Sequence, residues 1–297
     1  MKVLFTGGQG FIGKHVSDRF KEIGHEVFLF EGDILNSSQL FKCLSAQNYD
    51  FIVHLAGISS VPQGESDLEK LFAVNQFGTS LLLEGIKAHC PNTHLIFSSS
   101  AQVYDSQQVT TPLSESSKVS PLNAYARSKY TSELLIESYS QLYQVTSTVF
   151  RIFNHTHKTH HREFFLPSIY ERCVQAKSQG LKTQEISVGN LDLIRDISPV
   201  QRIRDIFSKY VAAKHDKGSS KIFNICSGVG LNLKVLAHEL GNAIGVDIKF
   251  QPDPARFRKN DPSFFVGNNA KIVSFLDMHW DDTMNEKYLV KKFLEDI

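Results

Sequence analysis

Three glycines directly after the first apolar run of the chain constrain its fold most strongly. Residues 3–6 are expected to form a short buried strand, and residues 12–23 carry a helical pattern. Gly7, Gly10 and Gly13 lie between these segments at three-residue spacing. A residue without Cβ lets the backbone approach a pyrophosphate closely, and the helix N-terminus adds amide donors. The turn therefore predicts a dinucleotide site, with an ordinary strand-to-helix turn as the alternative.

The alternation of strand and helix continues through the first half of the chain. Strands are expected at residues 3–6, 26–30, 51–55, 94–97 and 145–152, and helices at residues 12–23, 38–44, 68–88 and 122–143. This order predicts an α/β fold, namely a Rossmann-like doubly wound parallel sheet with helices on both faces. Such a sheet binds ligands at the carboxyl ends of its strands.

The pattern becomes less regular in the second half. Helices are expected at residues 167–179, 199–213 and 232–241, strands at 186–188 and 223–226, and loops at 155–162 and 252–262. We expect residues 1–155 to form the dinucleotide-binding Rossmann domain, with later segments returning to it. Residues 156–297 are then expected to form mainly a smaller α/β region that binds the substrate.

The charge balance and the cysteines bear on partners and compartment. The 297-residue chain has a net charge of +1, which argues against nucleic acid as a partner. Its four cysteines show no paired spacing, which favours free thiols in a reducing compartment over disulfides or a zinc site. The N-terminal apolar run is too short for a signal peptide or a membrane span. We therefore expect a cytoplasmic protein without a membrane partner.

The end of the second expected strand bears on the choice of cofactor. Glu31 follows this strand, and Asp33 and Ile34 come just after it. A carboxylate here accepts hydrogen bonds from the adenosine ribose hydroxyls and repels a 2′-phosphate, and no arginine follows nearby. The segment therefore favours NAD over NADP, with an exposed acidic turn as the alternative.

A tyrosine and a lysine four residues apart indicate redox chemistry on an alcohol or ketone. Tyr125 and Lys129 share one face of an expected helix. Lowering a tyrosine pKa by about three units requires roughly 4 kcal/mol of preference for the phenolate. A nearby ammonium and a nicotinamide cation can supply this in a partly dry site. A serine from the neighbouring strand end would hold the substrate oxygen. The alternative is a surface pair at helical spacing.

Six segments carry a resemblance to a known family: FTGGQGFIG at 5–13, VHLAG at 53–57, VNQFGTS at 74–80, FSSSAQVY at 97–104, YARSK at 125–129 and RIFNH at 151–155. The chain resembles the nucleotide-sugar branch of the extended short-chain dehydrogenase/reductase superfamily, which uses NAD(P)(H). The resemblance implies that Ser100 is a catalytic hydroxyl with Tyr125 and Lys129, and that Asn154 contacts the substrate. The expected cofactor-binding residues are Gly7, Gly10, Phe11, Ile12, Gly13, Glu31, Asp33, Ile34, Leu55, Ala56, Gly57, Asn75, Ser98, Tyr125 and Lys129.

Three later segments narrow the resemblance. VGNLDLIRDI at 188–197, FNICSG at 223–228 and DPARFRKND at 253–261 are similar to GDP-mannose 4,6-dehydratases and, more closely, to GDP-4-keto-6-deoxymannose reductases. The resemblance makes Arg195 and Arg258 candidates for binding the nucleotide diphosphate and guanosine, and a guanidinium suits that task because it binds phosphate bidentately. Surface arginines are the alternative. A homodimer is also implied.

Position 102 discriminates between the reactions of this branch. By resemblance, the dehydratases carry Glu there and the GDP-fucose-forming epimerase-reductases carry Cys, whereas this chain has Gln102. A carboxamide forms hydrogen bonds but does not exchange protons at neutral pH. This favours a substrate-binding Gln102 and simple reduction of the C4 ketone of a GDP-4-keto-6-deoxy sugar by NAD(P)H. The alternatives are an NDP-sugar 4-epimerase with tightly bound NAD, a 4,6-dehydratase-like enzyme and a non-catalytic NAD(P)-binding regulator.

A histidine-rich loop departs from the family pattern. His155, His157, His160 and His161 occupy a segment where relatives usually continue with glycine and proline. We expect the loop near the sugar, where it would suit an unusual substrate such as a 6-deoxyheptose. No carboxylate or cysteine follows at ligand spacing, so no metal site is expected.

Overall fold

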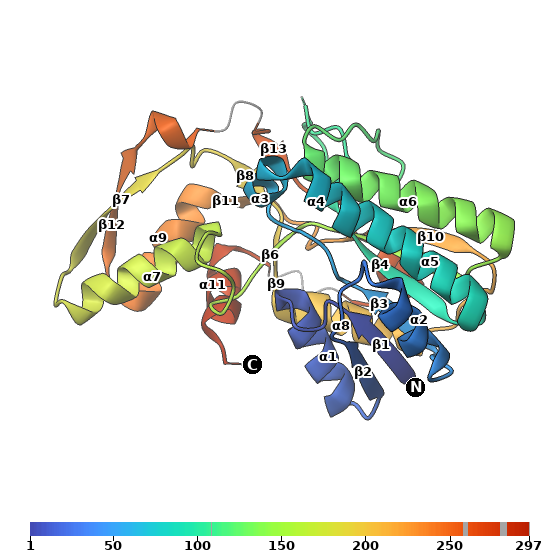
Figure 1. Cartoon of the computed structure of the whole chain (residues 1–297). Helices are drawn as coiled ribbons and strands as arrows, with labels where there is room; N and C mark the ends of the chain where they lie inside the picture. Colours follow the sequence, from blue (N-terminus) through green and yellow to red (C-terminus); the bar gives the residue numbers. More distant parts are fainter. Residues whose placement is uncertain (108, 258–260, 280–283, 297) are drawn as a thin grey trace. The chain divides into compact units, whose positions relative to one another are not determined.

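The computed structural model describes residues 1–107, 109–257, 261–279 and 284–296, and it divides into two compact units (Figure 1). The first unit comprises residues 1–105, 115–152 and 203–225, and the second comprises the described residues of 106–114, 153–202 and 226–297. Residues 203–225, from the second half of the chain, thus belong to the same unit as the N-terminus.

The first unit contains a six-stranded sheet in the order β10-β5-β4-β3-β1-β2. Its strands are β1 (Lys2–Thr6), β2 (Glu26–Phe30), β3 (Phe51–His54), β4 (His94–Ser100), β5 (Ser147–Ile152) and β10 (Ser220–Ile225). All neighbouring strands are parallel. After β2 the chain crosses back over β1 to form β3, so the order reverses between β1 and β3. In such sheets, ligands bind at the carboxyl ends beside this reversal.

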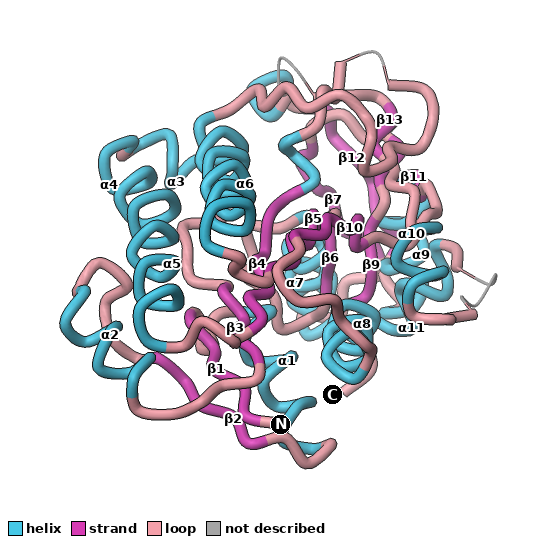
Figure 2. Tube along the Cα trace, turned by 90° about the vertical axis from the view of Figure 1, so that its right-hand side faces the viewer, coloured by secondary structure: helices cyan, strands magenta, loops and turns pink. Residues whose placement is uncertain are grey.

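Helices cover both faces of this sheet. They are α1 (Phe11–Glu22), α2 (Ser37–Ser45), α3 (Val61–Ser66), α4 (Leu68–Phe72), the π-helix η1 (Ala73–Phe77), α5 (Gly78–His89), the 3-10 helix η2 (Ala101–Val103), α6 (Ala124–Tyr143) and α8 (Val200–Ala212). Adjacent strand residues point to opposite faces. On β5, Val149 joins the core beneath α2, α5 and α6, whereas the Phe150 ring lies 4.9 Å from Phe207 of α8. Helices α5 and α6 lie side by side (Figures 1 and 2). The predicted doubly wound α/β fold is therefore confirmed.

The segment 68–89 differs from the single interrupted helix that we expected. It consists of α4, the π-helix η1 and α5 in direct succession. A Cβ on Gly78, where α5 begins, would lie 2.9 Å from Ile34 Cγ2, so the helix packs very closely there. The π-helix carries Asn75, and such single wide turns often occur at functional sites.

The described part of the second unit is built from short sheets and four helices. Its strands are β6 (Asn154–Thr156), β7 (Thr183–Val188), β8 (Ile194–Arg195), β9 (Ile197–Pro199), β11 (Leu231–Asn232), β12 (Asp247–Pro252) and β13 (Phe264–Phe265). Its helices are α7 (Phe165–Ser178), α9 (Leu233–Ile244), α10 (Ala270–Phe275) and α11 (Glu286–Leu294), with a 3-10 turn η3 (Pro254–Arg256). Leu166, Leu236, Leu240 and Phe293 lie in its core.

Two of these strands were not expected from the sequence: β6 overlaps the loop expected at residues 155–162, and β12 ends where the loop expected at residues 252–262 begins. Residues 154–156 pair in parallel with β9, and β12, which was not expected, pairs in parallel with β7. β6 has only three residues and no apolar pattern, whereas residues 247–251 of β12 alternate between polar and apolar, a strand signal that we missed. In the described part of the chain, no helix has the length and apolarity to cross a membrane.

Candidate active site

The glycine turn lies against the loop that follows β3. Gly7 has a φ of +71°, and a Cβ on it would lie 2.5 Å from the Ala56 backbone nitrogen. A Cβ on Gly13 would lie 2.3 Å from Gly7 O. Gly10 is the N-cap residue of α1, and among the described residues no side chain caps that helix. The turn therefore presents the α1 N-terminus at the β1–β3 reversal, which fits a dinucleotide pyrophosphate.

The same region brings other expected cofactor residues together. Leu55, Ala56 and Gly57 follow β3 directly, and the Leu55 N–H donates to Thr6 O at 2.9 Å. Phe11 and Ile12 lie in the first turn of α1.

The acidic segment after β2 is only partly as expected. Glu31 and Asp33 are exposed, and Asp33 Oδ1 accepts a hydrogen bond from Leu35 N at 3.0 Å. Ile34 is instead part of the hydrophobic core and packs against Gly78.

Ser100 and Tyr125 meet at the junction of β4 and α6. Ser100 ends β4, Tyr125 lies in the first turn of α6, and the Ser100 side chain is near enough to the Tyr125 hydroxyl to affect its pKa. Burial raises the pKa of Tyr125, and the neighbouring Ser100 side chain opposes that rise. The protein groups alone therefore leave this pKa raised, whereas the lowered pKa that we expected involves both Lys129 and the nicotinamide cation. The protein groups keep Tyr125 protonated at neutral pH, which suits a proton donor.

Lys129 lies one turn further along α6 and is buried. Its Nζ donates to Ser98 O at 2.9 Å and lies 5.0 Å from the centre of the Phe97 ring. A Cβ on Gly57 would be 3.5 Å from the same nitrogen. Burial lowers the pKa of Lys129 to about 8, and the charge of Glu133 opposes this effect. Lys129 therefore lies at the carboxyl ends of β3 and β4 with a proton that it can release near neutral pH.

Asn75 connects the loop after β3 to α6. Its Oδ1 accepts from Ile58 N at 2.7 Å, and its Nδ2 donates to Ile58 O at 3.0 Å and to Ser128 Oγ at 2.9 Å. The side-chain amide that we expected at the cofactor thus holds the loop and the helix together.

A buried polar chain, which the sequence interpretation missed, supports this connection. Thr79 Oγ1 donates to Asn75 O at 2.6 Å, so it must accept from His54 Nε2, which lies 3.0 Å away. His54 Nδ1 then accepts from Thr6 Oγ1 at 2.6 Å. Burial lowers the pKa of His54 to about 3, with the Lys129 charge contributing. A histidine at the end of a buried strand was the available signal.

A second buried group that we missed lies behind Lys129. Glu133 forms an ion pair with Arg151, with NH2 2.7 Å from Oε2, and both side chains are buried. Ser99 Oγ donates to the same carboxylate. The position of Glu133 four residues after Lys129 was the sequence signal. This carboxylate keeps a negative charge near the buried ammonium.

Gln102 is adjacent to the Ser100–Tyr125 pair. Its backbone N–H donates to Ser100 Oγ at 3.2 Å, and its Oε1 accepts from Asn123 Nδ2 at 2.9 Å. Asn123 Oδ1 accepts from Ala126 N at 2.8 Å and thereby caps α6. Gln102 is therefore hydrogen-bonded to the residue that begins the helix carrying Tyr125.

The other expected substrate residues belong to the second unit. Asn154 Nδ2 donates to Asp196 O at 3.3 Å, and its side chain is exposed. Arg195 is buried, and its NH2 donates to Asp261 Oδ1 at 2.7 Å. The Arg195 guanidinium thus already has a carboxylate partner within its own unit. Arg258 lies outside the described residues.

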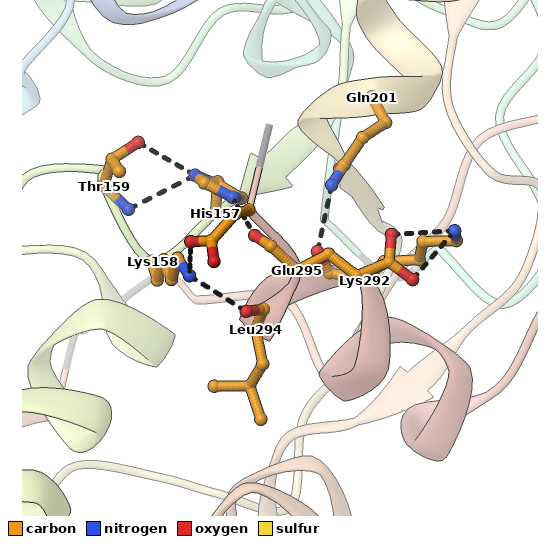
Figure 3. Close-up of polar contacts among 8 residues, drawn as sticks. His157, Lys158, Thr159, Gln201, Lys292, Leu294 and Glu295 are labelled. Carbon is orange, nitrogen blue, oxygen red and sulfur yellow. Dashed lines mark hydrogen bonds and ion pairs between the residues drawn. The ribbon is translucent and has the colours of Figure 1, made fainter.

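The histidine-rich loop contacts the end of α11 (Figure 3). His157 Nε2 donates to Glu295 O at 3.0 Å, and its Nδ1 accepts from Thr159 N at 3.3 Å. Lys158 Nζ donates to Leu294 O at 3.0 Å and pairs with Asp296. A cation near a helix C-terminus stabilises the last carbonyl groups. These contacts give the unusual loop a role in holding the C-terminal helix, which the sequence interpretation did not anticipate.

Comparisons with known proteins agree on one family. The model of the NAD dependent epimerase/dehydratase family matches residues 3–226. The chain is 27% identical over 281 residues to GDP-6-deoxy-D-mannose reductase of Pseudomonas aeruginosa, covering 91% of this chain and 89% of that protein. It is 28% identical over 310 residues to a UDP-glucose 4-epimerase of Rhizobium leguminosarum bv. trifolii, covering 92% and 91%.

A solved structure supports the same assignment. The structure of RMD from Pseudomonas aeruginosa complexed with NADPH superposes with a TM-score of 0.86 at 25% identity, covering 99% of this chain and 97% of that one. The glycine turn described above fits such a dinucleotide. The chain therefore belongs to the NAD dependent epimerase/dehydratase family, in the nucleotide-sugar branch of the extended short-chain dehydrogenases/reductases, and NAD(P) is its cofactor.

Proposed function

We propose that the protein reduces the C4 ketone of a GDP-4-keto-6-deoxy sugar to the alcohol with NAD(P)H. The observation that carries this proposal is the position of Tyr125, whose pKa is raised by burial, beside Ser100 and beside a Gln102 that cannot exchange protons. A dehydratase or a 3,5-epimerase requires a further acid or base next to the ketone, and a carboxamide does not supply one. The likeness to a GDP-6-deoxy-D-mannose reductase supports the same reaction.

When bound, the cofactor would supply the hydride for C4. The residues of the protein stabilise the negative charge on the C4 oxygen and donate a proton to it. Ser100 donates a hydrogen bond to the C4 oxygen and orients it. Tyr125 transfers its phenolic proton to that oxygen as negative charge develops there. The Lys129 ammonium then stabilises the phenolate, and its pKa of about 8 allows it to pass on a proton near neutral pH. The glycine turn and the α1 N-terminus bind the pyrophosphate.

The remaining assignments belong to the same proposal. Glu31 and Asp33 bind the adenosine ribose, which favours NADH over NADPH. Residues 1–155 with 203–225 bind the cofactor, and the rest of the chain binds the nucleotide sugar through Asn154, Arg195 and Arg258. For Arg195 to bind phosphate, its ion pair with Asp261 must first break. We propose a cytoplasmic homodimer, supported by the exposure of Phe77 and of three apolar residues of α6, namely Leu134, Leu142 and Tyr143.

A reductase assay tests the reaction. Purified protein is mixed with GDP-4-keto-6-deoxymannose and NADH or NADPH, and the loss of reduced-nicotinamide absorbance is followed. We expect turnover that Tyr125→Phe abolishes and that Tyr130→Phe, on the same helix, leaves intact. No turnover with either cofactor, from a folded protein that binds them, would reject the proposal.

A 4-epimerase is the second candidate, because a UDP-glucose 4-epimerase shows similar identity to this chain. Epimerisation returns the hydride to the same sugar, so the enzyme must retain its cofactor throughout. NAD that stays bound through dialysis, with interconversion of UDP-glucose and UDP-galactose, would favour this reaction over the reductase.

A further inference from the structure

The amide orientation of Gln102 is determined by its neighbours. The Ala126 backbone N–H donates to one amide atom of Asn123 at 2.8 Å, so that atom must be the oxygen. The other amide atom of Asn123 is therefore nitrogen, and it lies 2.9 Å from the Gln102 amide. Because an amide nitrogen cannot accept a hydrogen bond, Gln102 turns its oxygen toward Asn123.

The nitrogen of Gln102 is left for another partner. Within residues 1–107, 109–257, 261–279 and 284–296, no atom accepts a hydrogen bond from Gln102 Nε2, and this atom is not buried. The backbone N–H of the same residue donates to Ser100 Oγ, and the Ser100 side chain is near enough to Tyr125 to affect its pKa. An oriented N–H2 donor therefore belongs to a residue in direct contact with the proposed reaction centre.

We infer that Gln102 determines substrate specificity by donating a hydrogen bond from Nε2 to the C3 hydroxyl oxygen of the sugar. The inference rests on the proposed function, because that function places the C4 oxygen at Ser100 and Tyr125. In a 6-deoxy sugar C6 carries no oxygen, so C3 bears the hydroxyl next to the reacting carbon. A hydrogen bond at C3 fixes the ring while hydride is delivered and discriminates against sugars that lack this acceptor.

Either of two single substitutions can replace the hydrogen-bond donor that residue 102 presents to the substrate with an acceptor. In Asn123→Asp, one carboxylate oxygen still caps α6, because Asp is as good a cap as Asn. The other oxygen now accepts from Gln102, so the Gln102 amide turns over and presents its oxygen to the sugar. Gln102→Glu has the same effect by changing residue 102 itself. One carboxylate oxygen accepts from Asn123, and the second oxygen faces the substrate.

Both variants are assayed for kcat and KM on GDP-4-keto-6-deoxymannose and on its 3-deoxy analogue. We expect kcat/KM for the full substrate to fall about tenfold to a hundredfold, the effect of a lost and opposed hydrogen bond. The wild type should discriminate against the analogue by a similar factor, and both variants should lose that discrimination. Asn285→Asp, the same change at the N-cap of α11, should leave kcat/KM unchanged.

A purely structural role for Gln102 predicts a different result. It leaves kcat/KM and the discrimination within twofold of wild type in both variants, since both keep the cap, and this would overturn the inference. If Asn123→Asp unfolds, Gln102→Glu decides alone. Calorimetric binding of GDP-rhamnose, an alcohol with the same C3 hydroxyl, separates the two proposals. A wild type that binds it without reducing the ketone rejects the function, and unchanged affinity in the variants rejects the role of Gln102.

Discussion

Each unit buries a titratable side chain at or just after the end of a strand, namely His54 in the first unit and Asp196 in the second, and the two side chains have different roles. In the first unit, His54 is neutral, because burial lowers its pKa to about 3. In the second unit, Asp196 accepts hydrogen bonds from Ser227 N and Oγ at 2.8 and 2.7 Å and from Gly228 N at 2.9 Å. Burial raises the pKa of Asp196 to about 6, and these hydrogen bonds oppose the rise.

The two side chains differ in what their hydrogen-bond partners hold in place, and this bears on which groups of each unit can contact a ligand. The His54 chain ends on Asn75, which braces α6 and leaves Tyr125 and Lys129 at the strand ends. Asp196 instead organises loops of its own unit, and Arg195 beside it is paired with Asp261. The first unit thus holds the proposed reaction centre in place, whereas Asn154 and Arg195, the described substrate candidates of the second unit, have internal partners.

Removal of Lys129 should have the largest effect on function. In Lys129→Met the phenolate of Tyr125 loses its neighbouring cation, so we expect kcat to fall about 10²- to 10⁴-fold. The reductase assay at saturating cofactor measures this, and Lys42→Met on the exposed face of α2 serves as the control. A kcat within threefold of wild type would mean that proton transfer from Tyr125 does not depend on the Lys129 ammonium.

Glu133→Gln should destabilise the first unit. It leaves the buried Arg151 without a counter-charge, which costs about 3–5 kcal/mol of unfolding free energy. It also removes the charge that raises the pKa of Lys129, so the alkaline limit of activity should move to lower pH. Chemical denaturation and a pH–rate profile measure the two effects. Glu137→Gln, at an exposed position one turn later, should change neither.

The buried histidine and aspartate predict opposite responses to acid. The His54 pKa is lowered in the fold, so its stabilising contribution is complete above about pH 6.5 and declines toward pH 3 by roughly 1.4 kcal/mol per unit. The Asp196 pKa is raised, so its contribution is complete below about pH 3.8 and is lost as the pH rises through about 6.

Amide hydrogen exchange at pH 6.5 and pH 4.5, corrected for intrinsic rates, resolves the two units. Protection of β1 and β3 should decrease on acidification, whereas protection around residues 226–228 should increase. The second trend should disappear in Asp196→Asn. Parallel behaviour of both units would contradict the assignment of these pKa directions.

The smallest expected effect concerns the end of α11. Lys158→Met removes the cation from the helix C-terminus, so we expect about 0.3–1 kcal/mol of local destabilisation. Exchange of amides in residues 289–294 should accelerate, with global stability nearly unchanged. Lys177→Met, an exposed change on α7, is the control. Unchanged exchange would indicate that His157 and Gln201 hold this helix end without Lys158.

Sequence patterns predicted the fold class and the family, and they located residues that the structure places at the carboxyl ends of the strands. The glycine turn, the alternation of strands and helices and the Tyr125–Lys129 spacing were readable, because parallel strands bring their carboxyl ends to one edge. The three-residue strand β6 was not readable, since it has no apolar pattern and its pairing partner is distant in sequence, whereas the alternation of β12 was overlooked. The π-helix at Asn75 was visible only as an irregularity near Gly78.

The sequence by itself determined the fold class, the family and the identity of the groups at the strand ends, because these depend on periodicity and on short motifs. Only the tertiary structure decided how those groups are tuned. Burial raises the pKa of Tyr125 and lowers that of Lys129, and both shifts depend on neighbours from other elements. The amide orientation of Gln102 likewise follows from Asn123, which lies 21 positions along the chain. Hydrogen-bond direction and desolvation arise only when distant segments meet, so no local pattern contains them.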